Sequence, residues 1–362
     1  MPLRIAILGT RGIPASYGGF ETFAEELSHR LAARGHEVTV YCRKPHPERM
    51  YRGVYLQYLP TIRHKYTDTM VHTALSTLHL LFTGADVALF CNAANAIFTW
   101  APRLFATATV LNVDGLERKR RKWNRLAKGW YALSEWFSTW MPTKAVSDAR
   151  TISRYYRSRY RTETAYIPYG APVGKVPTTE ILDKLGLKPG EYFLYVTRFE
   201  PENNPLLVRE AFETLDTEKK LVLVGDAPYA HDYIRKVRNT SNPRVILPGA
   251  IYGRGYHELQ SHCLAYVHAT EVGGTHPALI EAMGRGCLVL YLRTPENEEV
   301  AGGVALPFDP SNLAERMRAV LNMPEEDRQV IAEAAMKRVA SRYNWDAVTD
   351  AYERLFSELV RR

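Results

Sequence analysis

Three clusters of glycine, arginine and acidic side chains have the composition of sites that bind phosphate and ribose. The first cluster follows the apolar run Arg4–Leu8 and places Gly18 and Gly19 immediately before a helical pattern. Glycines there would let backbone N–H groups approach an anion at the positively polarised end of the helix. The spacing does not match the dinucleotide-binding fingerprint GxGxxG, so a plain strand-to-helix connection is the alternative interpretation.

The second cluster begins at Arg198, directly after the apolar run 192–197. Open α/β sheets bind ligands at the carboxyl ends of their strands, and a guanidinium offers a planar fork of donors to phosphate oxygens. Arg198 is therefore the leading candidate for an anion ligand. The alternative is a surface ion pair between Arg198 and Glu200 or Glu202.

The third cluster combines a Gly-Gly loop with the start of a helix. Gly274, Thr275 and His276 precede a proline, which is favoured in the first helical turn, and Glu281 follows one turn inside. Backbone N–H groups at such a helix start can bind phosphate, and a carboxylate in the first turns can accept hydrogen bonds from two ribose hydroxyls. The alternatives are a solvated carboxylate at Glu281 and a loop histidine with a backbone partner at His276.

The elements that position these clusters alternate between short apolar runs and helical patterns. We predict strands at 4–8, 37–42, 54–59, 86–90, 108–112, 143–147 and 164–167, and again at 192–197, 221–224, 244–247, 265–268 and 288–291. Such alternation is typical of α/β domains of the doubly wound type, with parallel sheets covered on both faces. We expect an N-terminal domain at 1–170, a linker rich in Pro and Gly at 171–190, a C-terminal domain at 191–342, and a last helix at 343–362 that packs back on the N-terminal domain.

Taken in order, these motifs resemble those of the retaining family 4 glycosyltransferases with the GT-B fold. The resemblance covers essentially the whole chain, through Gly18-Gly19 and the stretches 34–38, 197–204, 223–226 and 279–286. It implies two Rossmann-like domains with a cleft between them and a nucleotide sugar as the donor. The residues that it implies for donor binding are Gly18, Gly19, Arg198, Asn203, Gly274, Thr275, His276 and Glu281.

Two positions depart from the family pattern. The first of the family's paired glutamates falls on Gly273, with Glu271 as the nearest acid before it, and the family's phosphate-binding lysine is replaced by Asn203. Arg198 is then the remaining fixed charge of its motif, and as a candidate catalytic residue it would stabilise the departing diphosphate. The second candidate catalytic residue is Asp114, at a predicted strand end, which would orient the sugar or the acceptor. No nucleophile is assigned.

The stretches 112–117, 201–204 and 273–277 look like those of bacterial rhamnosyltransferases of surface-polysaccharide assembly. This resemblance implies a nucleoside diphosphate sugar such as dTDP-rhamnose as the donor and a lipid-linked saccharide as the acceptor. We expect no cofactor and no metal, because no carboxylate pair of the D-x-D kind follows a predicted strand. The alternatives are a sugar-nucleotide epimerase of the same fold and a protein without turnover that binds anionic lipid or nucleic acid.

Positive charge is concentrated in one segment. The chain has a net charge of +8, whereas residues 103–161 alone hold fourteen Lys or Arg against four acids. An amphipathic helix is predicted there, with apolar positions at Trp123, Leu126, Trp130, Leu133, Phe137 and Trp140, and the next helix presents a basic ridge of Arg150, Arg154, Arg157 and Arg161. We expect this region to face an anionic membrane surface. The alternative is an aromatic stripe in the domain core with solvated arginines; nucleic acid is not expected, since no recognised binding module accompanies the charge.

The spacing of the cysteines and the hydropathy of the chain are used to predict where in the cell the protein is located. The four cysteines lie far apart, without the spacing of a disulfide framework or a zinc site, and the first residues lack the layout of a signal peptide. The longest uncharged stretch, 69–85, is shorter than the ~20 apolar residues of a membrane span. We expect a cytoplasmic protein that is peripheral on the inner face of the membrane.

Overall fold

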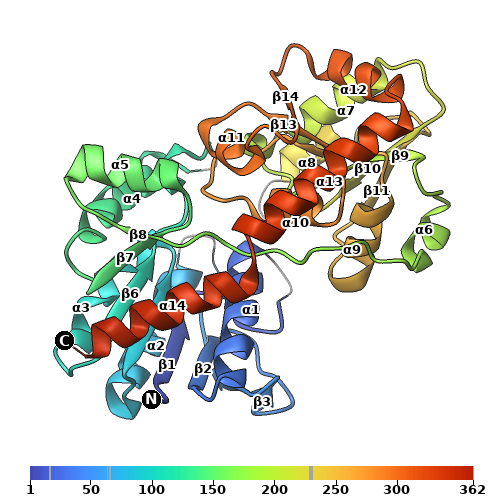
Figure 1. Cartoon of the computed structure of the whole chain (residues 1–362). Helices are drawn as coiled ribbons and strands as arrows, with labels where there is room; N and C mark the ends of the chain where they lie inside the picture. The colour runs from blue at the N-terminus through green and yellow to red at the C-terminus, as the bar shows by residue number, and fades with distance from the viewer. Residues whose placement is uncertain (16–17, 63, 65–66, 122, 228–230, 362) are drawn as a thin grey trace. The chain divides into compact units, whose positions relative to one another are not determined.

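The computed structural model describes residues 1–362 except 16–17, 63, 65–66, 122, 228–230 and 362 (Figure 1). The described chain forms two compact units, the first made of residues 1–119, 123–170 and 345–362 and the second of residues 120–122 and 171–344. Each unit is built on a predominantly parallel sheet with helical connections. The predicted class, two Rossmann-like doubly wound domains, is confirmed.

The sheet of the first unit has the strand order β3-β4-β2-β1-β5-β6-β7-β8. The strands, in chain order, are β1 (Arg4–Leu8), β2 (Glu37–Cys42), β3 (Met50–Tyr51), β4 (Val54–Tyr58), β5 (Val87–Cys91), β6 (Ala108–Asn112), β7 (Lys144–Ser147) and β8 (Ala165–Tyr166). All neighbouring pairs are parallel except β3 and β4. Every residue of β5 is buried, as expected for a central strand covered on both faces.

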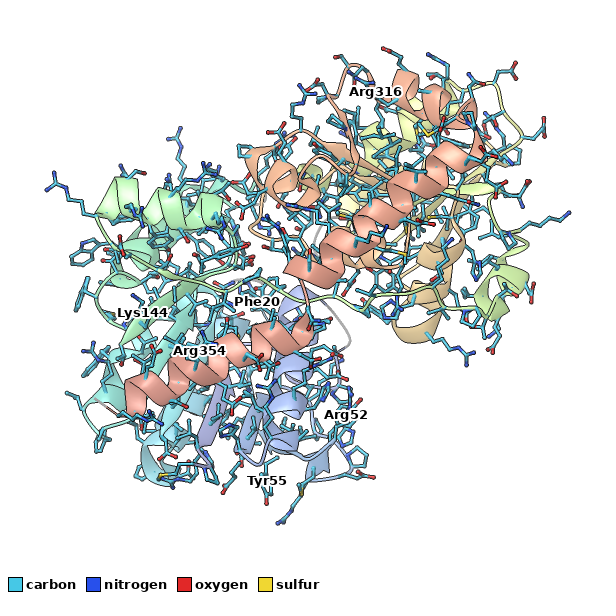
Figure 2. All side chains as sticks on the ribbon, in the orientation of Figure 1. Phe20, Arg52, Tyr55, Lys144, Arg316 and Arg354 are labelled. Atoms are coloured by element: carbon cyan, nitrogen blue, oxygen red, sulfur yellow. The ribbon has the colours of Figure 1, made fainter. Side chains whose placement is uncertain are left out.

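Two helices of the first unit pack against each other on one face of its sheet. They are α1 (Gly19–Ala33) and the last helix, α14 (Trp345–Val360), which crosses the strands in Figure 1. Tyr352 of α14 is buried with its ring 5.4 Å from that of Phe23, whereas Arg354 points outward (Figure 2). The last helix therefore completes the core of the first unit.

Helix α1 lies in the connection from β1 to β2, which leads toward the β3 edge of the sheet. The other helices of the first unit lie in connections that lead toward the β8 edge. They are α2 (Asp68–Thr83), η1 (Ala93–Phe98), α3 (Trp100–Arg103), η2 (Glu117–Lys119), α4 (Arg125–Phe137) and α5 (Arg150–Tyr160). Crossovers between parallel strands are right-handed, so connections that run in opposite directions cover opposite faces. These helices thus cover the face opposite to α1.

The sheet of the second unit has the order β11-β10-β9-β12-β13-β14, with all pairs parallel. Its strands are β9 (Tyr192–Val196), β10 (Lys220–Val224), β11 (Val245–Gly249), β12 (Ala265–His268), β13 (Val289–Leu292) and β14 (Leu306–Phe308). Its helices are α6 (Glu180–Leu185), η3 (Pro201–Asn203), α7 (Pro205–Glu213), α8 (His231–Arg238), α9 (Gly253–His262), α10 (Pro277–Gly284), α11 (Pro295–Ala301), α12 (Leu313–Leu321) and α13 (Glu325–Arg342).

The segment 171–190, expected as a linker, groups with the second unit and contains α6. The carboxylate of Glu258 on α9 accepts hydrogen bonds from the Ile181 N–H at 2.9 Å and the Thr178 hydroxyl at 2.5 Å. These bonds anchor the start of α6 to α9, so this segment is part of the second unit and not a free connection.

Within the described part of the chain, no helix has both the length and the hydropathy needed to cross a membrane.

Candidate functional site

The loop after β9 holds Arg198 at the carboxyl edge of the second sheet. The Arg198 side chain is about one-third exposed, and its guanidinium lies 4.0 Å from the Glu200 carboxylate. The Asn203 side-chain amide donates to the Arg198 carbonyl at 2.7 Å, and the Asn203 carbonyl accepts from the Tyr195 hydroxyl at 2.5 Å. Polar bonds to main-chain carbonyls therefore shape the loop, while the Arg198 side chain remains partly exposed.

The glycine of the Leu-Val-Gly-Asp element packs against this loop. Gly225 has a φ of +147°, and a Cβ there would lie 1.7 Å from the Thr197 carbonyl oxygen. No other residue fits so close to the backbone that enters the Arg198 loop.

The loops after β9 and β12 are tied to each other, because these strands are neighbours in the sheet. The Asn204 side chain donates to the Ala269 carbonyl and to the Glu271 carboxylate, both at 3.0 Å. The Glu271 N–H donates to the Glu202 carbonyl at 2.9 Å. The structure thus brings the second and third sequence clusters to one edge of the second sheet.

The helix α10 begins at this edge, directly after Gly274, Thr275 and His276, all three of which are buried. A Cβ on Gly273 would lie 2.5 Å from Cε1 of His276, so a larger residue at position 273 would have to displace the imidazole. Burial, followed by the charge of nearby Arg120, lowers the pKa of His276 to about 3. His276 is therefore a neutral side chain beside the first, positively polarised turn of α10.

Glu281 lies one turn inside α10 and is buried. The Tyr256 hydroxyl of α9 donates to Glu281 Oε2 at 2.6 Å and accepts from the Gln260 side-chain amide at 2.8 Å. These bonds contradict the interpretation of Glu281 as a solvated carboxylate. They fix the orientation of a carboxylate that was predicted to bind ribose.

The two departures from the family pattern have distinct surroundings. Asn203 is buried and bonded within its own loop, so it shapes the segment that carries Arg198. Glu271 accepts from Arg121 Nη2 at 2.7 Å and from Asn204, and residues 120–122 group with the second unit. Direct donor contacts by Asn203 remain a prediction.

The remaining predicted site residues lie in the first unit. Gly18 and Gly19 begin α1. Asp114 follows β6 with a φ of +54°, and its N–H donates to the Asn112 side-chain oxygen at 3.1 Å. These residues occupy the carboxyl edge of the first sheet, the edge where open α/β sheets bind ligands.

The basic ridge and the aromatic stripe are also in the first unit. Arg150, Arg154, Arg157 and Arg161 are all exposed, on α5 and directly after it. Three of the six predicted stripe positions are exposed, namely Leu126, Leu133 and Trp140. The other three, Trp123, Trp130 and Phe137, are partly buried, and Phe137 packs against the core of the unit, so the alternative of a core stripe holds for part of it. Lys122, in the basic segment, lies outside the described residues.

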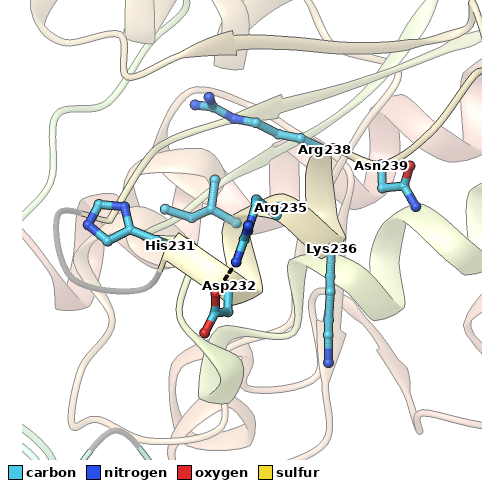
Figure 3. Close-up of a pocket in the computed structure, with 7 residues that line it drawn as sticks. His231, Asp232, Arg235, Lys236, Arg238 and Asn239 are labelled. Carbon is cyan, nitrogen blue, oxygen red and sulfur yellow. Dashed lines mark hydrogen bonds and ion pairs between the residues drawn. The ribbon is translucent and has the colours of Figure 1, made fainter.

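A surface pocket on α8 is lined by other residues, namely His231, Asp232, Ile234, Arg235, Lys236, Arg238 and Asn239 (Figure 3). None of the predicted site residues lines it. Its link to the motifs is an ion pair of 3.9 Å between Arg238 and Asp226 of the Leu-Val-Gly-Asp element. Among the described residues, no three His, Cys, Asp or Glu side chains are grouped as metal ligands would be.

Sequence comparison matches both halves of the chain to glycosyltransferases. Residues 17–170 match the family described as Glycosyltransferase Family 4, and residues 178–338 match that described as Glycosyl transferases group 1. The fold and these matches identify the chain as a glycosyltransferase of the GT-B class, and they favour this class over an epimerase or a binding protein without turnover. More particularly, residues 17–170 are similar to the family 4 glycosyltransferases. No similar sequence was found among curated proteins.

Solved structures of other glycosyltransferases share the fold along nearly the whole chain. A sucrose-phosphate synthase from Thermosynechococcus elongatus is 19% identical with a TM-score of 0.81, covering 98% of each chain. HepE of Anabaena, solved with UDP-glucose, is 15% identical with a TM-score of 0.76, covering 98% of this chain and all of its own. WaaG, a glycosyltransferase involved in lipopolysaccharide biosynthesis, is 18% identical with a TM-score of 0.72, covering 96% of this chain and 98% of its own.

Proposed function

We propose that this glycosyltransferase transfers rhamnose or another hexose from a nucleoside diphosphate sugar, such as dTDP-rhamnose, to a lipid-linked saccharide in polysaccharide biosynthesis. The sugar C1–O bond to the diphosphate breaks, an acceptor hydroxyl forms the new glycosidic bond with retention of configuration, and the hydroxyl proton is released. The protein acts in the cytoplasm, at the inner face of the membrane.

The donor-site proposal is supported by the placement of the Arg198 loop and the start of α10 at one edge of the second sheet, with Glu281 one turn inside that helix. Arg198 supplies positive charge for the diphosphate, and the first turn of α10 supplies backbone N–H donors. Glu281, held by Tyr256, accepts from the ribose hydroxyls. Diphosphate departure is then favoured by charges and dipoles that are already in place.

Two relatives support the substrate classes. HepE was solved with UDP-glucose, and WaaG is involved in lipopolysaccharide biosynthesis. A nucleoside diphosphate sugar and a lipid-linked saccharide fit the same chemistry here. Asp114, at the carboxyl edge of the first sheet, is the residue proposed to orient the sugar or the acceptor.

A panel of dTDP, UDP and GDP sugars tests the proposal. One donor should raise the melting temperature as a ligand of the folded state does, and should release its nucleoside diphosphate faster when a lipid-linked saccharide is added. If no donor raised the melting temperature and none was hydrolysed, the donor site would be wrong. Turnover with soluble saccharides alone would contradict the lipid-linked acceptor.

A further inference from the structure

The first unit carries most of the exposed large apolar and aromatic side chains in the described part of the chain. Ten of nineteen such side chains lie between residues 75 and 140, on α2, α3 and α4 and the turns that end them. Single exposed apolar residues are normal on any protein surface, whereas a concentration on neighbouring elements marks a surface that contacts a partner or a membrane.

Helix α2 has its apolar face turned to solvent. Leu75, Leu78 and Phe82 are exposed, and Phe82 is 84% exposed. Its buried residues, except for Leu80, are polar or ionisable: His72, Thr73, Ser76 and Thr77. Ser76 and Thr77 donate to carbonyls of their own helix, each at 2.7 Å, which satisfies these hydroxyls without an apolar inner face.

Helix α4 and the turn after it also expose large apolar side chains. Leu126, Leu133, Trp136 and Trp140 are exposed, Trp136 by 48% and Trp140 by 50%. The fully buried residues of α4 are Ser134 and Glu135, while Phe137 is partly buried and packs against the core of the unit. A surface helix normally buries its apolar stripe, so two helices that expose theirs indicate a non-aqueous contact on the outside.

The helix α3 joins these two faces. It contacts α2, and η1, the turn before it, contacts both α2 and α4. Arg103 of α3 donates to the carbonyls of Trp140 and Met141, at 3.2 and 2.7 Å. Leu104 and Phe105, at its end, are exposed, so apolar side chains continue across three elements on one face of the sheet.

The exposed charged side chains of α3 and α4 are basic. Arg103, Arg125 and Lys128 are exposed. The acids of α2, η1, α3 and α4 are Asp68, which pairs with Arg43 at 2.8 Å, and the buried Glu135, which pairs with Arg118 at 3.0 Å. A second copy of the chain would bring the same cations together across a twofold interface, whereas anionic lipid head groups complement them.

We propose that the exposed residues Leu78, Phe82, Leu104, Leu133, Trp136 and Trp140, here called the docking face, lie on an anionic lipid bilayer. Tryptophan suits this place because its ring is apolar and its N–H is polar, which is why it collects at membrane interfaces. The exposed arginines of α5, which covers the same face of the sheet, extend the positive charge beyond the docking face. The proposal rests on the membrane location proposed above and does not depend on the identity of the sugar donor.

Sedimentation with vesicles of phosphatidylglycerol and phosphatidylethanolamine, without any sugar donor, tests this contact. The unmodified protein should bind, and brominated acyl chains should quench part of its tryptophan fluorescence. Replacing Trp136→Ser together with Trp140→Ser should weaken binding about tenfold or more, since two interfacial anchors are lost. The same double variant should lose most of the quenching.

The matched control is Tyr252→Ser with Val330→Ser, which removes two exposed large side chains from the second unit. This variant should bind vesicles as the unmodified protein does, and both variants should keep its melting temperature. The proposal is overturned if the unmodified protein does not bind, if the tryptophan variant binds equally well, or if light scattering shows a dimer that the tryptophan variant breaks. Because vesicle binding needs no donor, its failure would overturn the proposed location at the membrane and would leave the proposed sugar transfer untouched.

Discussion

The loop that carries Arg198 is held by bonds from the side chains of Asn203 and Tyr195 to main-chain carbonyls, and these bonds do not involve the Arg198 side chain. Arg198→Ala should lower turnover ~10²-fold or more, because a charge-assisted donor to the departing diphosphate is lost. Release of nucleoside diphosphate is the measurement. Arg235→Ala, which removes a surface partner of Asp232, is the control that should keep its turnover. Near-normal turnover of Arg198→Ala would exclude Arg198 from the diphosphate site.

The hydrogen bond from Tyr256 to Glu281 gives two variants whose nucleotide affinities can be compared. Glu281→Gln should weaken nucleoside diphosphate binding ~10-fold or more, since hydrogen bonds to charged groups contribute about 1.5 to 3 kcal/mol. Tyr256→Phe should weaken it less, because the carboxylate stays and loses only the bond that orients it. Calorimetry gives both dissociation constants, and an unchanged value for Glu281→Gln would return this residue to a purely structural role.

At the residue scale, the sequence located the motif residues but not their partners. Arg198, His276 and Glu281 could be found because each follows a strand or begins a helix at a fixed short spacing. Tyr256 could not, because it precedes Glu281 by 25 residues on a different helix and no local pattern connects them. Long-range hydrogen bonds depend on packing, which composition and spacing do not encode.

At the scale of the element, α2 buries a histidine whose protonation opposes folding. Burial, and then the charge of Arg43, lowers the pKa of His72 to about 4 from an ordinary value of 6.5. Between these values the unfolded chain binds the extra proton, so the stability due to neutral His72 is complete above about pH 6.5 and falls as the pH drops toward 4. The slope approaches about 1.4 kcal/mol per pH unit.

His72→Leu should therefore reduce the loss of stability between pH 7 and pH 5, because the proton acceptor is gone. Urea unfolding at several pH values gives the slope for each variant. His231→Gln, at an exposed position on α8, is the control and should leave the slope as it is. Identical slopes for His72→Leu and the unmodified protein would show that His72 does not resist protonation in the fold.

The strands and the aromatic stripe were predictable to different degrees. Buried strands such as β1, β2, β6 and β12 have the predicted bounds, since continuous apolar runs between turn residues identify them. The short strands β3 and β14 were missed, the latter having Pro307 at its centre. Spacing predicted the amphipathic α4, but it cannot tell which face turns inward, because the buried Glu135 is bonded to distant Arg118 and Tyr155.

At the scale of the whole molecule, the residues proposed for nucleotide binding and those proposed for membrane binding lie mostly in different units. The residues proposed to hold the nucleotide, apart from Gly18 and Gly19, belong to the second unit, whereas the docking face and the basic ridge belong to the first. The alternation of strands and helices made the two-domain class predictable. The end of the chain returns to the first unit because Trp345 and Tyr352 are buried in its core, and their rings lie 6.5 and 5.4 Å from that of Phe23.

This division predicts that membrane binding and donor chemistry can be separated. Arg154 and Arg157 are exposed on α5, and replacing both with Glu removes two positive charges and adds two negative ones in the first unit alone. Binding to anionic vesicles should fall, since each basic side chain near such a surface contributes about 1 kcal/mol, while hydrolysis of the soluble donor should stay close to normal.

Raising the salt concentration should weaken the binding of the unmodified protein in the same way, because the charges are screened over a Debye length of ~8 Å at physiological ionic strength. Arg235→Glu with Lys236→Glu, both exposed on α8, is the matched reversal in the second unit and should leave vesicle binding close to normal. If the α5 variant bound vesicles as before at low salt, the apolar docking face alone would account for membrane contact and the ridge would have no part in it.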